Sequence, residues 1–200
     1  EGFAFSEWWI KYDYTFLSNL KPLNKTKTLA CIMSNSTGQK YHTIRRDYLE
    51  RFCDNHLVDV YGRIEPWGSI VKNYKGVCGN ANPSGQNNDH MSGKEEVYLN
   101  YMYALEFDAF GEWYASERIF DALLLWCKPL YFGGNGMKKL LPPKSHYYLD
   151  INGKGDDVYS LINSRDYEES LDDIKKARQI LLNELNPWAI THKAIFGEYK

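Results

Sequence analysis

Residues 114–134 read YASERIFDALLLWCKPLYFGG and join the start of an amphipathic helix to a short apolar strand. Ser116 is a residue type that caps helix N-termini, and apolar residues then recur at the spacing of one helical face as far as Trp126. Lys128 and Pro129 end this pattern, and an apolar run of strand type, Leu130–Phe132, follows before two glycines. The segment therefore predicts a helix over Ser116–Trp126 and a strand directly after it.

The first turn of this helix carries residue types suited to a phosphorylated ligand. A helix N-terminus presents unpaired N–H groups and the positive end of the helix dipole, which favours a bound phosphate. Arg118 adds a full positive charge, and Glu117 can accept hydrogen bonds from the hydroxyls of a sugar or ribose. Alternatively, Glu117 only stabilises the helix through its interaction with the helix dipole, which contributes about a few tenths of a kcal/mol.

Strand and helix patterns alternate along the rest of the chain, which predicts an α/β fold with a Rossmann-like parallel sheet and helices on both faces. The long stretch 62–93 is rich in Gly, Asn and Pro and is expected to form a loop over the ligand cleft. The remaining expected strands are Leu29–Ser34, Val58–Tyr61, Tyr101–Phe107 and His146–Ile151, and the remaining expected helices are Thr43–Cys53, Lys94–Asn100, Met137–Leu141, Asp156–Asn163, Asp166–Leu185 and Trp188–Phe196.

Polar residues and glycines follow several of these strands. In an open parallel sheet, ligands bind beyond the carboxyl ends of the strands, so these segments are expected to form one site. Residues 1–27 do not continue the alternation and are rich in aromatic residues, so they are expected to cover a face of the sheet or to supply an acceptor surface. We therefore divide the chain into an N-terminal segment, residues 1–27, and a Rossmann-like domain with the expected ligand site, residues 28–200.

Composition narrows the class of protein. The formal net charge of −2 gives no electrostatic reason to expect nucleic acid as a partner. The four cysteines show neither zinc-binding spacing nor a disulfide pattern, and no Asp-x-Asp motif occurs that would hold a divalent cation. No long apolar run and no signal-peptide pattern is present, which predicts a soluble domain, either cytoplasmic or the lumenal part of a trimmed membrane-anchored enzyme.

The segment 114–134 resembles the nucleotide-sugar-binding signature of the α-1,3/1,4-fucosyltransferases, in which an aromatic residue, a small residue, Ser or Thr, Glu and Lys open a helix. Other segments are similar to this family in the same order along the chain, from about Thr28 to the C-terminus. They are Ser34-Asn35 followed by Arg45 and Tyr48, the strand and glycine turn Val58–Arg63, the strand Tyr101–Asp108, and Leu141–Ser145.

The resemblance implies a fold like the donor-binding half of a GT-B glycosyltransferase, and it implies roles for single residues. Tyr114 matches the family's aromatic residue near the sugar and the β-phosphate. Glu117 matches the residue that accepts hydrogen bonds from ribose or sugar hydroxyls, and Arg118 matches the phosphate-binding Lys. Ser34 and Asn35 match the loop after the first strand, and Arg45 matches the Arg of the family's Arg-x-x-aromatic pattern. Because no Asp-x-Asp motif is present, we expect Arg45 to oppose the phosphate charge in place of a metal ion, a role that Arg46 could take instead. Asp108-Ala109 stands where the family has Glu-Asn, so a UDP-sugar remains an alternative to GDP-fucose as the donor.

The family's catalytic base is a Glu in its acceptor half, and the resemblance, which begins at about Thr28, covers only the donor half. A base must then come from residues 1–27, where Glu1, Glu7 and Asp13 are candidates and Glu7 is preferred, or from a second domain or chain. The resemblance thus implies an inverting, metal-independent glycosyltransferase with no cofactor, in which a nucleotide sugar is the donor and a carbohydrate hydroxyl is the acceptor. The alternative is a non-catalytic nucleotide- or carbohydrate-binding module derived from such an enzyme.

Overall fold

The centre of the molecule is a five-stranded sheet in which all neighbouring strands run parallel, in the order β2-β1-β3-β4-β5. The computed structural model describes residues 7–34, 38, 40–52, 58–63, 71–78, 93–108, 115–153 and 155–197. The strands are β1 (Lys27–Ile32), β2 (Val58–Tyr61), β3 (Tyr101–Phe107), β4 (Lys128–Phe132) and β5 (Tyr147–Tyr148).

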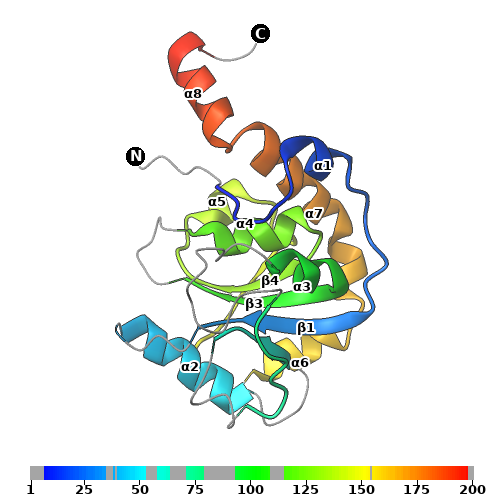
Figure 1. Cartoon of the computed structure of the whole chain (residues 1–200), viewed down its shortest axis with the longest axis vertical. Helices are drawn as coiled ribbons and strands as arrows, with labels where there is room; N and C mark the ends of the chain where they lie inside the picture. Colours follow the sequence, from blue (N-terminus) through cyan, green and yellow to red (C-terminus); the bar gives the residue numbers. More distant parts are fainter. Residues whose placement is uncertain are drawn as a thin grey trace.

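Helices lie on both sides of this sheet. Figure 1 shows α3 and α4 together on one side and α2 and α6 on the other. The helices are α1 (Tyr14–Asn19), α2 (Lys40–Phe52), α3 (Lys94–Asn100), α4 (Glu117–Leu124), α5 (Met137–Leu140), α6 (Asp156–Ile162), α7 (Asp166–Asn183) and α8 (Pro187–Phe196). The prediction of a Rossmann-like parallel sheet with helices on both faces is confirmed.

The join between α4 and β4 differs from the prediction by a few residues. The helix ends at Leu124, and Trp126 adopts a left-handed backbone conformation with φ 61°. The N–H groups of Leu125, Trp126 and Cys127 donate to the carbonyls of Ala122 and Leu123, which closes the last turn. The strand then begins at Lys128 and includes Pro129, so the Lys-Pro pair opens the strand instead of separating it from the helix.

The N-terminal segment contains a short helix that the sequence did not predict. The carboxylate of Asp13 caps α1 by accepting a hydrogen bond from the backbone N–H of Phe16 at 2.8 Å. Arg178 of α7 donates to the carbonyl of Leu17 at 2.5 Å, and the indole of Trp126 donates to the carbonyl of Leu20 at 3.0 Å. Residues 7–27 therefore pack against the α4–α7 side of the molecule.

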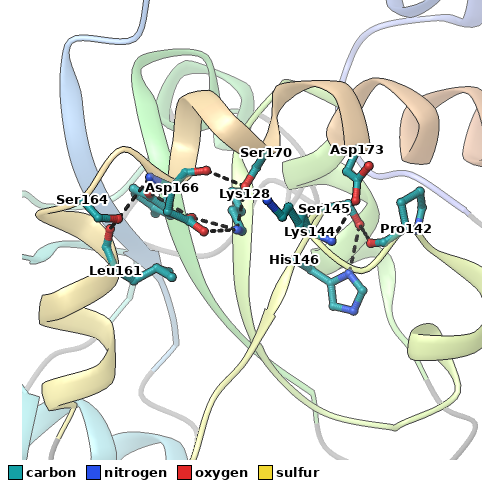
Figure 2. Close-up of polar contacts among 11 residues, drawn as sticks. Lys128, Pro142, Lys144, Ser145, His146, Leu161, Ser164, Asp166, Ser170 and Asp173 are labelled. Carbon is teal, nitrogen blue, oxygen red and sulfur yellow. Dashed lines mark hydrogen bonds and ion pairs between the residues drawn. The ribbon is translucent and has the colours of Figure 1, made fainter.

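A buried ion pair ties the start of β4 to α7. Lys128 is 2% exposed, and its Nζ lies 2.8 Å from Asp166 Oδ2 and 2.8 Å from Ser170 Oγ (Figure 2). These contacts lie at the amino end of β4. They are therefore at the opposite end of the parallel strands from the carboxyl ends, where a ligand is expected. No helix in the described ranges is long and apolar enough to cross a membrane.

Gly62, directly after β2, lets the carboxyl ends of β1 and β2 approach closely. Its φ is +118°, and a Cβ at this position would collide with the carbonyl group of Met33, which follows β1. We expect Gly62→Ala to lower the free energy of unfolding by about 2–3 kcal/mol, because it adds this clash to the cost of a left-handed backbone. Chemical denaturation measures the change.

Gly76→Ala is the matched control. Gly76 also has a positive φ, +93°, but a Cβ there would meet open space. We expect this variant to lose only about 1 kcal/mol. Equal losses for the two variants would contradict the close approach of β1 and β2.

Candidate functional site

The candidate site lies where the strand order reverses. In the order β2-β1-β3-β4-β5, the chain leaves β1 toward one edge of the sheet and leaves β3 toward the other. Open parallel sheets of this kind bind ligands in a crevice beyond the carboxyl ends of the two strands at such a point. Arg118, in the first turn of α4, reaches across this point. Its Nη1 lies 3.4 Å from the carbonyl oxygen of Ile32, the last residue of β1.

Asp108 fixes the start of α4 at the end of β3. Its Oδ2 accepts hydrogen bonds from the backbone N–H of Ser116 and from the hydroxyl of Tyr131, both at 2.8 Å. Its Oδ1 accepts from the hydroxyl of Ser116, which in turn accepts from the N–H of Arg118 at 3.4 Å. Asp108 is 5% exposed, so its carboxylate positions the helix that carries Glu117 and Arg118.

Arg45 brings a second guanidinium to the end of β1. Its Nη2 donates to the carbonyl oxygen of Ser34 at 3.3 Å and to the hydroxyl of Ser34 at 3.1 Å. Its Nε is buried and has no hydrogen-bond partner among the described residues. Burial, and then the positive charge of Arg118, lower the pKa of Arg45 to about 10. The two guanidiniums therefore lie close enough to repel each other.

The charges of three carboxylates act on Arg118. Burial alone would lower the pKa of Arg118, but the negative charges of Glu106, Glu117 and Asp108 together raise it. Glu106 is fully buried, and burial raises its pKa to about 8. Its Oε1 accepts a hydrogen bond from the hydroxyl of Tyr98 at 2.7 Å, while its Oε2 has no partner among the described residues.

Glu117 belongs to a buried ion network centred on Lys94. Lys94 Nζ lies 3.1 Å from Glu117 Oε1 and 3.1 Å from Asp121 Oδ2. The other oxygen of Asp121 accepts from the backbone N–H of Trp9 at 2.8 Å, and burial raises the pKa of Asp121 to about 7. The position of the Glu117 carboxylate is thus set by a lysine from the neighbouring helix α3.

Most of the predicted donor-site residues that the structure describes are gathered at this crevice. Ser34, Arg45, Asp108, Glu117 and Arg118 all lie beyond or beside the carboxyl ends of β1 and β3. Asn35 and Tyr114, also predicted for the donor site, lie outside the described residues, as do Glu1 and Ala109.

Glu7, the preferred candidate for the base, lies apart from this group. It is exposed and lines an open cavity of about 1060 Å³ between the N-terminal segment and α8, together with Asp13 and Trp188. No hydrogen bond or ion pair joins Glu7 to Arg45 or Arg118 in the part of the chain that is described. The structure therefore does not bring the two proposed catalytic residues, Glu7 and Arg118, into contact.

Sequence reasoning missed Lys94 and Glu106, although both carry a signal. A lysine in the first turn of a helix opposes the helix dipole, which indicates that another interaction compensates it. A glutamate within the apolar strand 101–107 indicates a buried carboxylate, which is rare without a partner.

Ser145 and His146 are in contact but do not form a hydrolytic site. Ser145 Oγ lies 3.0 Å from His146 Nδ1 and donates to the carbonyl of Pro142 at 2.7 Å (Figure 2). Ser145 is fully buried, and burial lowers the pKa of His146 to about 4. The nearby Asp173 accepts from the backbone N–H of Lys144 instead of orienting the imidazole. Among the described residues, no group of three or more His, Cys, Asp or Glu side chains is arranged to hold a metal ion.

Comparison with known proteins gives the same relatives by sequence and by structure. No protein-family model matches the chain. The chain is 29% identical over 129 residues to alpha-(1,3)-fucosyltransferase C of Drosophila melanogaster, a match that covers 64% of this chain and 25% of that protein.

Two solved structures of α1,3-fucosyltransferase superpose on the chain with a TM-score of 0.53. One, with GDP-fucose, is 20% identical and is matched over 77% of this chain and 40% of its own length. The other, with GDP, is 18% identical and is matched over 82% of this chain and 49% of its own length. The chain thus spans about a quarter of the curated relative and less than half of each solved structure. It is similar in sequence and in fold to part of the α1,3-fucosyltransferases, which confirms the resemblance inferred from its motifs.

Proposed function

We propose that this chain is the donor-binding part of an inverting glycosyltransferase that binds a nucleotide sugar, GDP-fucose by its relatives, and transfers the sugar to a carbohydrate hydroxyl. One observation carries the proposal: two guanidiniums, of Arg45 and Arg118, meet at the crevice beside the amino end of α4. No carboxylate of the described residues lies within ion-pair distance of either guanidinium, and the Nε of Arg45 is buried without a partner. A diphosphate would supply an anion that can bind both guanidiniums directly.

The proposed reaction needs a positive field at the leaving group. The acceptor oxygen attacks the anomeric carbon, the bond from that carbon to the β-phosphate oxygen breaks, and its electron pair leaves with the nucleoside diphosphate. Arg45, Arg118 and the positive end of the α4 dipole would oppose the charge that develops on the phosphate. Since the sequence has no Asp-x-Asp motif, we assign this role to side chains and backbone and propose transfer without a divalent cation.

The acceptor proton must pass to a base as the bond forms. Glu7 is our proposal within this chain, and the exposed cavity that it lines gives it access to solvent and to a ligand. Because Glu7 does not contact the arginine pair, we propose that a second domain or chain completes the acceptor site.

A non-catalytic binding module is the second candidate function. One observation favours it: Glu7 lines a cavity beside α8 and does not contact Arg118. Such a module would keep affinity for the nucleotide and lack any turnover.

Thermal unfolding in the presence of nucleotide sugars tests the donor. We expect GDP-fucose to raise the melting temperature, since a ligand at about one hundred times its Kd stabilises the folded state by about 2.7 kcal/mol. UDP-sugars should give little shift, and a chelator should not change the result. A shift with UDP-sugars alone would contradict guanine as the nucleobase of the donor. No shift with any nucleotide sugar would contradict the donor site itself. Stabilisation by GDP-fucose with no release of GDP, alone or with acceptor glycans, would favour the binding module.

A further inference from the structure

A histidine stands next to the two arginines of the candidate site. His42 precedes Arg45 by three residues on α2, so the two side chains lie on the same face of the helix, one turn apart. The side chain of His42 is half-buried. None of the motifs that resemble fucosyltransferases includes this residue.

The charged groups that face His42 come from two elements. Arg45 acts on it from its own helix, and Arg118 acts on it from α4. The carboxylates Glu106, Glu117 and Asp108 in turn act on Arg118. Burial, followed by the two arginine charges, lowers the pKa of His42, so the imidazole is mainly neutral near pH 7 when no anion is bound.

We propose that His42 is a third phosphate-binding cation of the donor site, neutral when the site is empty and protonated when the diphosphate of a nucleotide sugar binds between Arg45 and Arg118. This inference rests on the proposed donor site and adds a proton to its binding reaction. One ring nitrogen of His42 takes that proton from solvent as the ligand enters.

The physical reason is the change of sign in the local field. Before the ligand binds, the positive charges of Arg45 and Arg118 make protonation of His42 less favourable. A nucleotide sugar carries two phosphates that stay ionised from pH 5 to pH 8, and it would place these negative charges among the three side chains. The imidazolium then becomes the favoured form, and its charge adds to that of the arginines when the sugar–phosphate bond breaks.

Binding of GDP-fucose to the wild-type chain at several pH values tests this inference. GDP-fucose is a better probe than GDP, because the terminal phosphate of GDP has a pKa close to 6 and would itself take up protons. We expect affinity to rise about tenfold between about pH 8 and pH 5.5, which corresponds to a shift of about one unit in the pKa of one group. Titration calorimetry at pH 6.5 in buffers of different ionisation heats should show net uptake of a fraction of a proton.

Variants of His42 test whether this residue takes up the proton when GDP-fucose binds. We expect His42→Gln to bind GDP-fucose with an affinity that no longer rises at low pH and with no proton uptake. His42→Lys should bind at all these pH values as tightly as the wild type does at low pH, since its cation is permanent. His192→Gln, on the exposed helix α8, is the matched control and should keep the wild-type pH dependence.

Glu106 is the alternative source of a bound proton, because it is buried, has a raised pKa and faces Arg118. If His42→Gln keeps the wild-type dependence on pH while Glu106→Gln loses it, the proposal for His42 is wrong. An affinity of the wild type that does not change with pH would overturn it as well. Both results leave the donor site intact, whereas failure of GDP-fucose to bind at any pH would overturn the donor site and this inference together.

Discussion

Replacing Arg118 with methionine is expected to weaken GDP-fucose binding about 30- to 100-fold and to abolish any measurable sugar transfer. A charge-assisted hydrogen bond contributes about 1.5–3 kcal/mol, and here the lost group also lies where charge develops on the leaving phosphate. Methionine keeps much of the apolar stem, so the packing of α4 on the sheet should survive. Titration calorimetry gives the affinity, and release of GDP in the presence of an acceptor gives the rate.

Two further variants separate charge from shape at this position. Arg118→Lys should recover most of the lost affinity, because the relatives' signature carries a Lys there and the charge is retained. Arg46→Met is the matched control, since Arg46 neighbours Arg45 on α2 but pairs with Glu50 at 3.5 Å and is 34% exposed. We expect less than a twofold change for Arg46→Met. A loss at Arg46 as large as the loss at Arg118 would show that the wrong arginines have been assigned to the phosphate.

Replacing Lys94 with methionine is expected to cost the folded state about 3–5 kcal/mol. Lys94 is 9% exposed, and its ammonium is the shared partner of Glu117 and the fully buried Asp121. Removing one member of a buried ion network leaves a carboxylate without its counter-charge in a medium of low polarity. Denaturant titration, followed by fluorescence, measures the loss.

The effect of Lys94→Met should depend on pH with a definite sign. The pKa of Asp121 in the folded state is already raised to about 7, and removal of the ammonium should raise it further. A carboxyl group whose pKa is higher in the folded state binds more protons there than in the unfolded chain, so stability falls as pH rises. The variant should therefore lose more stability at pH 8 than at pH 6.

Lys176→Met is the control for Lys94→Met. Lys176 is 64% exposed and pairs with Asp173 at 3.6 Å on the surface of α7, so its loss should cost less than about 0.5 kcal/mol. Adding Asp121→Asn to Lys94→Met should recover part of the stability, because the uncompensated charge is removed. If the double variant is no more stable than Lys94→Met alone, the account of a buried charge is wrong.

Local patterns predicted the sheet and most of its helices. β2, α3 and β3 occur with the predicted bounds, because each is a short run with a consistent apolar pattern. α1 escaped prediction, since its single buried residue, Leu17, gives no helical periodicity, and its cap at Asp13 is a common residue type in loops. β5 is shorter than predicted, because only Tyr147 and Tyr148 pair with β4.

The site was predictable where it follows strand ends and helix starts. Ser116, Arg118 and Asp108 are placed by chain order alone, because parallel strands all end at one edge of the sheet. The partners that lie beneath them were not predictable in the same way: Lys94 reaches Asp121 across 27 positions in the sequence, and local spacing carries no information on such pairs. The hypothesis for Glu7 came from its neighbours in the sequence, which do not determine its distance from the arginines.

A structure of the chain bound to GDP-fucose would show whether a diphosphate binds between two guanidiniums at the amino end of α4. Phosphate oxygens are expected within hydrogen-bond distance of both Arg45 and Arg118, beyond the carboxyl ends of β1 and β3. A nucleotide bound elsewhere on the chain, with neither arginine in contact with its phosphates, would contradict the account.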